Sequence, residues 1–322
     1  MPGARSPLSA ATGATTRDIE RAGGQEGDMT EIVVGVDGSE SGMRAVSWAL
    51  DEAVHRGLPV RLVHVMPRWA LEMPETSRHA AVGRWAREEA SDLLARTSEA
   101  ARRQKPSVKV VSQLLPGDPR TVLLTASTHE AMLVVGSHGT GGFSGMLLGS
   151  VAAGVAGRSS CPVVVVRHPP QIADSGEIVV GVDGSLHSRA ALEMAYAEAA
   201  CRSRPVRAVY AWRKLTGAMG DRLPFSADAA ALYGTHRNEN DARRMLAEAI
   251  AGLAERYPDV KLVEQVEHGH PVDVLIQAST AAELLVVGHR AGHAVAGLTL
   301  GSVARGVLHH ARCPIAIVPA YP

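Results

Sequence analysis

The chain has few cysteines and aromatic residues, no net charge and no long hydrophobic run. Its three cysteines, Cys161, Cys201 and Cys313, are too few and too scattered for a disulfide framework or a zinc site. Lys+Arg and Asp+Glu each number 33, which argues against a dedicated nucleic-acid binder. No run of about 18 apolar residues occurs, so no transmembrane helix is expected. The N-terminus lacks the basic-then-apolar pattern of a signal peptide, and we therefore predict a cytoplasmic protein.

The sequence contains the same series of motifs twice, in the same order. Residues 32–39 and 178–185 both read IVVGVDGS, and LGSVA recurs at 148–152 and 300–304. The offset between the repeats is 146 residues at their start and 152 from Gly117 and Gly269 onward. A chain of 322 residues has the length of about two domains. We predict a disordered tail at 1–30, a first domain at 31–168, a Pro- and Gly-bearing linker at 169–176 and a second domain at 177–320.

Apolar runs alternate with helix-like spacing in each repeat. The runs predict strands at 32–36, 60–65, 108–115, 132–135 and 163–166, and again at 178–182, 206–211, 261–266, 284–287 and 315–318. Helices are expected between them, including 79–104 and 119–129. This alternation predicts an α/β protein of two tandem doubly wound, Rossmann-like domains, each with a five-stranded parallel sheet flanked by helices. In such sheets ligands bind at the carboxyl ends of strands, where the strand order reverses.

A glycine-rich loop follows the fourth predicted strand. Residues 136–150 read GSHGTGGFSGMLLGS, with five glycines from Gly136 to Gly145. Glycines let backbone N–H groups approach an anion, and a helix beginning near Ser150 would point its N-terminal N–H groups at the same place. The loop is not a Walker A motif, because the chain contains no Gly-Lys dipeptide, and Ser144 interrupts the Gly-x-Gly-x-x-Gly fingerprint. On composition alone, a loop that is merely flexible is the alternative to phosphate binding.

An aspartate directly follows the first strand of each repeat. Asp37 and Asp183 can accept hydrogen bonds from ribose hydroxyls or from an adenine amino group. The sequence Asp-Gly-Ser is also typical of turns, so each aspartate could instead form an Asx turn or a helix cap.

Other chemistry is less well supported. The histidine pairs each offer only two ligands, so no metal site is expected; they are His309–His310, His268/His270 and His289/His293. His138 and Arg290 occupy equivalent positions in the two loops and could touch a phosphate, or simply be solvated. No motif ties a serine to a particular histidine, so no catalytic residue is predicted.

Taken together, the two motifs resemble the universal stress protein family, in its tandem-domain, ATP-binding form typical of actinobacteria. The pattern Gly-x2-Gly-x9-Gly-Ser is met by Gly136, Gly139, Gly149 and Ser150. The resemblance extends over nearly the whole chain, twice, and leaves out only the first 30 residues.

The resemblance implies an ATP ligand, with or without Mg²⁺. In the first half it places at the nucleotide Gly35, Val36, Asp37, Val65, Val135, Gly136, Gly139, Gly149, Ser150 and Val151. In the second half it places there Gly181, Val182, Asp183, Ala211, Val287, Gly288, Gly292, Gly301, Ser302 and Val303. The second half departs at one point, because Ala291 stands where the pattern has glycine and Gly292 comes one residue late.

The implied function is that of a stress or dormancy regulator acting through nucleotide-dependent conformation or through a protein partner. Two alternatives stay open: a slow ATPase or nucleotidyl-transferring enzyme, and a scaffold that needs no nucleotide. In this family fifth strands commonly pair across a dimer axis. Here the resemblance implies that the two fifth strands could pair within one chain, and further homodimerisation is also compatible with the sequence.

Overall fold

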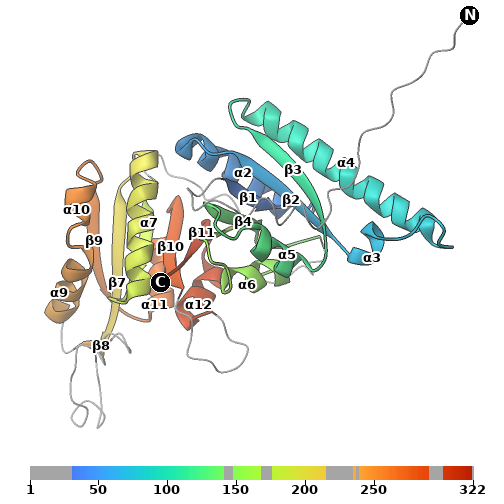
Figure 1. Ribbon diagram of the computed structural model, residues 1–322. Helices are drawn as coiled ribbons and strands as arrows, with labels where there is room; N and C mark the ends of the chain where they lie inside the picture. Colours follow the sequence, from blue (N-terminus) through green and yellow to red (C-terminus); the bar gives the residue numbers. More distant parts are fainter. Residues whose placement is uncertain are drawn as a thin grey trace, which may run out of the picture.

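The computed structural model describes residues 31–140, 148–167, 176–214, 235–236, 239–289 and 300–320. The predicted tail, most of the predicted linker, Arg290, Ala291 and Gly292 lie outside these ranges. The described chain is an α/β structure, as predicted, and the strands of its two halves form one long sheet with helices on both faces (Figure 1). None of the helices in these ranges is both long and apolar enough to span a membrane.

The first half forms a five-stranded parallel sheet in the order β3-β2-β1-β4-β5. Its strands are β1 (Ile32–Gly35), β2 (Val60–Met66), β3 (Val110–Pro116), β4 (Met132–Gly136) and β5 (Val163–Val166). Its helices are α2 (Glu40–Arg56), α3 (Arg68–Leu71), α4 (Ala80–Gln104), α5 (Pro119–Ala126) and α6 (Ser150–Ala156). The order reverses between β1 and β4, which confirms the doubly wound topology.

The second half repeats this arrangement as β9-β7-β6-β10-β11. Its strands are β6 (Ile178–Val182), β7 (Val206–Lys214), β9 (Leu262–His268), β10 (Leu284–His289) and β11 (Ile315–Pro319), with the two-residue β8 (Thr235–His236) beside the end of β7. Its helices are α7 (Leu186–Arg202), α9 (Glu239–Ile250), α10 (Leu253–Arg256), α11 (Pro271–Ala278) and α12 (Ser302–His310).

One predicted helix end is wrong. The helix expected at 119–129 ends at Ala126, and the chain then turns. The Ser127 N–H still donates to Leu123 O at 3.0 Å, but His129 adopts a left-handed φ of 65° that cannot continue the helix. The third strand begins at Val110 rather than Val108.

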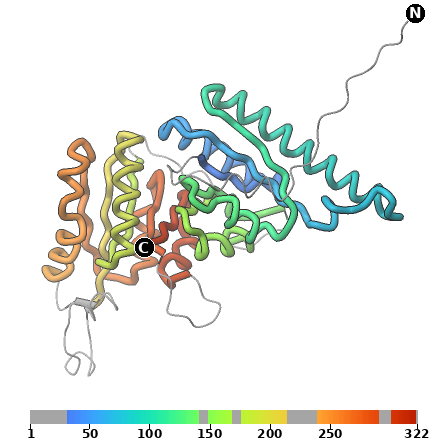
Figure 2. The backbone as a smooth tube through the Cα atoms, viewed as in Figure 1, coloured from blue at the N-terminus to red at the C-terminus, as the bar shows by residue number. Residues whose placement is uncertain are grey.

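The two halves join through their fifth strands. β5 and β11 pair antiparallel, with Val163 opposite Ile317 and Val165 opposite Ile315. This confirms the expected pairing within one chain, and Figure 2 shows the end of the first half meeting the red end of the second. All four residues of β5 are buried. The open edge that each half would otherwise present is thereby removed.

The core has two layers that each extend through both halves. Successive strand residues point to opposite faces of a sheet. Val164 and Ala316 therefore belong to the layer under α2 and α7, and Val163 and Ile317 to the layer under α6 and α12. Burial on both faces explains why the strands read as continuous apolar runs.

A buried network of ion pairs connects the last turns of α2 and α7. Arg56 binds Glu52 on its own helix and Glu198 on the other. Arg202 binds Glu198, with Nε 3.1 Å from Oε2, and also Glu52. The side chains of Glu52 and Glu198 are 0% exposed and that of Arg202 is 6% exposed. We call these four residues the crossed ion network, because each arginine binds one carboxylate from the first half and one from the second.

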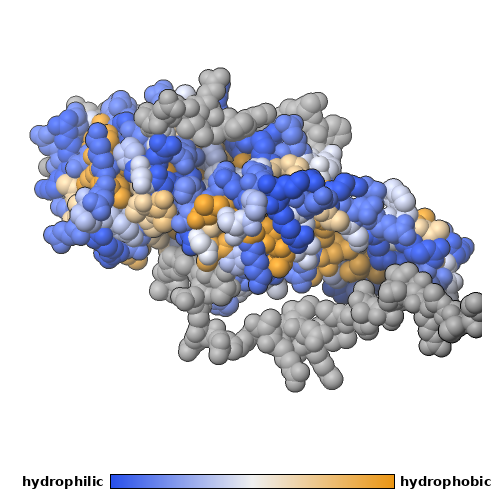
Figure 3. Space-filling model, turned by 90° about the horizontal axis from the view of Figure 1, so that it is seen from above, coloured by the Kyte–Doolittle hydropathy of each residue, from blue (hydrophilic) through white to orange (hydrophobic). Residues whose placement is uncertain are grey.

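Exposed apolar side chains are few on the described surface. The largest are Trp69 on α3 and Trp85 on α4, which are 54% and 66% exposed. On the face seen in Figure 3, hydrophilic side chains dominate and hydrophobic ones lie in separate patches.

The three thiols are expected to differ in reactivity. Cys201 is exposed, whereas Cys161 and Cys313 are buried. Burial raises the pKa of the Cys313 thiol to about 11 and also raises that of Cys161, so neither forms the reactive thiolate at about pH 8. A disulfide reagent that reacts with accessible thiols should therefore label one cysteine per native chain and all three after denaturation. Rapid labelling of all three in the native protein would contradict this burial.

Candidate functional site

Each half has a cavity at the carboxyl ends of its central strands, where the strand order reverses. The first-half cavity has a volume of about 380 Å³ and the second-half cavity about 290 Å³. Pockets for small ligands in α/β sheets occur at this location. Both cavities open on the sheet face that carries α5, α6, α11 and α12.

The first-half cavity brings together every first-half residue that the resemblance placed at a nucleotide. They are Gly35, Val36, Asp37, Val65, Val135, Gly136, Gly139, Gly149, Ser150 and Val151. These residues come from four separate segments of the chain. His138, which the sequence suggested as a possible phosphate contact, also lines the cavity, and the structure adds Val63, Pro119, Leu123, Thr140 and Ala152.

Asp37 lines the first-half cavity and also holds its loop. Its Oδ1 accepts hydrogen bonds from Ser39 N at 3.0 Å and Ser39 Oγ at 2.6 Å. Its Oδ2 accepts one from Thr140 N at 3.2 Å. Ser39 in turn caps α2 by accepting from Gly42 N at 3.0 Å. Asp37 therefore makes the Asx-turn hydrogen bonds that were the alternative interpretation, and the same side chain also lines the cavity.

The loop glycines are needed for close packing. A Cβ on Gly136 would lie 2.6 Å from Ser41 C and 2.7 Å from Gly42 N. A Cβ on Gly139 would lie 2.7 Å from Asp37 Oδ2. A larger residue does not fit at Gly136, and at Gly139 it would displace the Asp37 carboxylate, so mere flexibility does not account for these two glycines. The remaining loop residues 141–147, including Gly141, Gly142 and Gly145, lie outside the described residues.

The start of α6 leaves backbone donors beside these glycines. Its N-cap, Gly149, has no side chain to accept from the first turn. Gly149 N itself donates to Ser137 O at 2.7 Å, which closes the loop against the helix. α12 begins in the same way at Gly301. Free N–H groups at a helix start favour bound anions.

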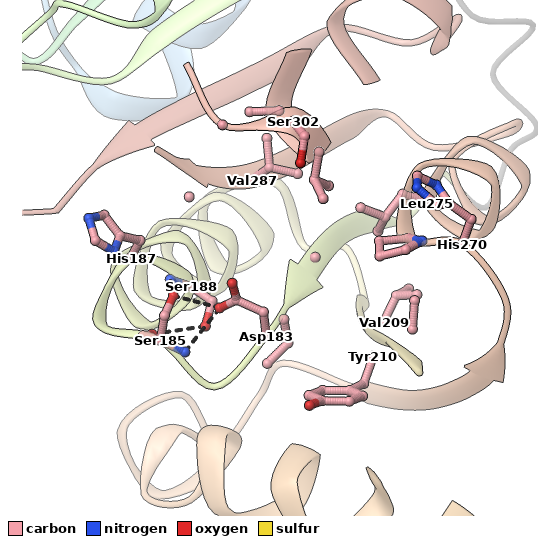
Figure 4. Close-up of a pocket in the computed structure, with 18 of the residues that line it drawn as sticks. Asp183, Ser185, His187, Ser188, Val209, Tyr210, His270, Leu275, Val287 and Ser302 are labelled. Carbon is pink, nitrogen blue, oxygen red and sulfur yellow. Dashed lines mark hydrogen bonds between the residues drawn. The ribbon is translucent and has the colours of Figure 1, made fainter. Parts of the chain in front are cut away.

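The second-half cavity likewise gathers the corresponding predicted residues, except Gly292, which lies outside the described part of the chain. They are Gly181, Val182, Asp183, Ala211, Val287, Gly288, Gly301, Ser302 and Val303. Asp183 Oδ1 accepts from Ser185 N at 3.0 Å and from Ser185 Oγ at 2.5 Å (Figure 4), as Asp37 does from Ser39. Burial, and then the charge of Asp183, raise the pKa of Tyr210 to about 12, so its phenol stays protonated at neutral pH.

The lining of the second-half cavity also includes two histidines and an arginine whose repeat counterparts do not line the first-half cavity. His187, Arg213 and His270 line it. At the repeat offsets of 146 and 152, the corresponding first-half residues are Ser41, Pro67 and Asp118, which are absent from the first-half lining. These residues were missed because no motif contains them, although aligning the repeats would have revealed the substitutions. Within the described residues, no group of three His, Cys, Asp or Glu side chains is arranged to hold a metal ion.

Comparison with known proteins agrees with this architecture. The model of the universal stress protein family matches the chain twice, at residues 29–167 and 176–319. The universal stress proteins Rv2005c and Rv2623 of Mycobacterium tuberculosis are 33% and 32% identical to the chain, covering 89% of it and 96% and 95% of their own lengths. In fold, the chain is similar to a crystal structure of a universal stress protein from Archaeoglobus fulgidus, with a TM-score of 0.65 and 19% identity over 91% of this chain and 99% of that one. The chain therefore belongs to the universal stress protein family, with one family domain in each half.

Proposed function

We propose that this protein is a cytoplasmic, ATP-binding stress or dormancy regulator, with the first-half cavity as its ATP site and the second-half cavity as a further nucleotide site. The observation that carries the proposal is the convergence of ten predicted contact residues, from four chain segments, on the first-half cavity. Regulation would follow from the way in which nucleotide binding changes the surface offered to a protein partner.

The first-half cavity has suitable chemistry for each part of the nucleotide. Val63, Val65 and Leu123 form an apolar wall for the base. The Asp37 carboxylate is an acceptor for ribose hydroxyls. Gly139 and the first turn of α6 present backbone N–H groups to the phosphates, and Gly149 lets the chain approach them without a side chain. Mg²⁺, where it accompanies ATP, would offset phosphate charge at the end of the cavity that carries the Ser150 hydroxyl.

Replacing Asp37 with alanine is expected to weaken ATP binding to the first half. Loss of hydrogen bonds to a charged acceptor costs on the order of 1.5–3 kcal/mol, or roughly 10- to 150-fold in affinity. Isothermal titration calorimetry of the full chain with ATP and Mg²⁺ measures this directly.

Asp183→Ala is the matched control, because it removes the equivalent carboxylate from the second half and should leave the first-half affinity unchanged. Thermal melting of both variants checks that they are folded. An Asp37→Ala variant that is folded and binds ATP as tightly as the parent would remove Asp37 from the site.

A further inference from the structure

The two cavities share an apolar floor but differ on the side formed by β7 and the start of α11. Side chains alternate along a strand, so Val209, Ala211 and Arg213 of β7 point to the same face, and all three line the second-half cavity. The first half has Val63, Val65 and Pro67 at these positions. The second half therefore has a smaller side chain where the first has Val65, and a guanidinium two residues further on.

Arg213 is available to a ligand. Its side chain is exposed at the rim, and among the described residues it has no hydrogen-bond or ion-pair partner. Its backbone is held in the sheet, where it pairs with Thr235 of β8. Arginine carries five N–H donors in a planar fork and no acceptor.

His270 adds a second donor on the same side. It caps α11, and its Nδ1 accepts a hydrogen bond from Val272 N at 3.3 Å. The neutral ring therefore carries its proton on Nε2, which can only donate. Figure 4 shows His270 beside Leu275, on the opposite side of the cavity from His187.

The first half has the opposite chemistry where the second has His270. Asp118 is an acceptor whose carboxylate is already used by its own helix. It accepts from Arg120 N at 3.1 Å and Thr121 N at 3.3 Å and pairs with the Arg120 guanidinium at 2.9 Å. The hydrogen bond from the Arg120 side chain lowers the pKa of Asp118 to about 2.

We propose that the second-half cavity selects a 6-oxopurine nucleotide, with a guanine or hypoxanthine base, and that Arg213 and His270 determine this specificity. The 6-oxopurine edge presents two acceptors, O6 and N7, whereas adenine presents an amino donor at position 6. The arginine fork matches O6 and N7 with two parallel hydrogen bonds. The inference rests on the proposed function, in that the cavity is taken as a nucleotide site.

The test uses the full chain with the first-half cavity weakened by Asp37→Ala. ATP, GTP and inosine triphosphate, each with Mg²⁺, are titrated by calorimetry. GTP and inosine triphosphate are expected to bind the second-half cavity about tenfold or more tightly than ATP, the discrimination typical of a bidentate arginine contact. Adding Arg213→Met should abolish this preference, while ATP binding to the first half of an Asp37-intact chain stays unchanged.

Arg189→Met is the matched control. It removes an exposed arginine of α7 that lies outside this cavity and should leave the preference intact. The proposal is overturned if the second-half cavity binds ATP as tightly as the two 6-oxopurine nucleotides, or if the preference survives Arg213→Met. Failure of the proposed function would give a different result. The chain with Asp37 intact would then bind no nucleotide in its first half.

Discussion

Replacing Glu198 with alanine is expected to lower the free energy of unfolding by about 3–5 kcal/mol, the usual cost of breaking a buried ion pair from one side. Glu198 accepts from Arg56 and Arg202 at the contact between α2 and α7, and its side chain is 0% exposed. Its loss leaves Arg56 and Arg202 sharing Glu52, with Glu283 as the further carboxylate partner of Arg202, so the buried positive charge is less fully compensated. Urea unfolding followed by circular dichroism measures the change.

An exposed ion pair supplies the matched control for the crossed ion network. Glu99 and Arg103 on α4 are 69% and 68% exposed, and Glu99→Ala should cost no more than about 1 kcal/mol because water screens the pair. Replacing all four network residues by apolar ones of similar size should recover much of the stability that Glu198→Ala loses. A Glu198→Ala variant that is as stable as Glu99→Ala would show that the network contributes little.

Replacing Gly136 with alanine is expected to abolish ATP binding to the first half and to cost about 3 kcal/mol of stability, at the upper end of overpacking effects. The added methyl group would meet backbone atoms of Ser41 and Gly42 at 2.6 and 2.7 Å. Backbone cannot rotate away as a side chain can, so α2 must move from the end of β4. That movement displaces Ser39, which orients the Asp37 carboxylate. Calorimetry with ATP and urea unfolding measure the two effects.

Gly154→Ala on α6 is the control for the Gly136 variant. Its methyl group would approach only side-chain carbons of Arg120, the nearest at 2.6 Å, and this side chain is half exposed and can shift. Alanine also has a higher helix propensity than glycine in the interior of a helix. Gly154→Ala should therefore keep both binding and stability near those of the parent. ATP affinity unchanged by Gly136→Ala would contradict the assigned packing.

The fold was largely predictable because its determinants are local and repeated. The buried strands read as continuous apolar runs, and the repeated IVVGVDGS placed β1 and β6 without ambiguity. The crossed ion network could not be predicted in the same way. Glu52 and Arg56 stand four residues apart, as do Glu198 and Arg202, and such pairs read as ordinary surface contacts within a helix. That each arginine also reaches the other half depends on how α2 and α7 pack.

The site was predictable where motifs carry it and not elsewhere. Asp37 and the loop glycines occur in motifs with fixed spacing, so their meeting at one cavity was expected. Pro119 and Leu123 come from α5, which carries no motif, and reach the cavity only because that helix packs beside α6. Arg213 and His270 were missed for the same reason. The structural role of Gly136 was also hidden, because a sequence cannot distinguish a glycine that approaches a ligand from one that approaches its own backbone.

The pairing of β5 with β11 makes the association of two domains an intramolecular event. Two separate chains would meet at a rate and extent set by their concentration, whereas here the partner domain is always present at the effective concentration that the linker allows. Any homodimer must therefore use surfaces other than these two strands. The two subunits of a symmetric homodimer are necessarily identical in sequence. Two domains fused in one chain can differ in sequence. Arg167, at the end of β5, donates to His309 O at 2.9 Å and Ala311 O at 2.8 Å at the end of α12, while its repeat counterpart is Pro319, which can donate nothing in return. The two halves can thus differ in the ligand or partner that each of them binds.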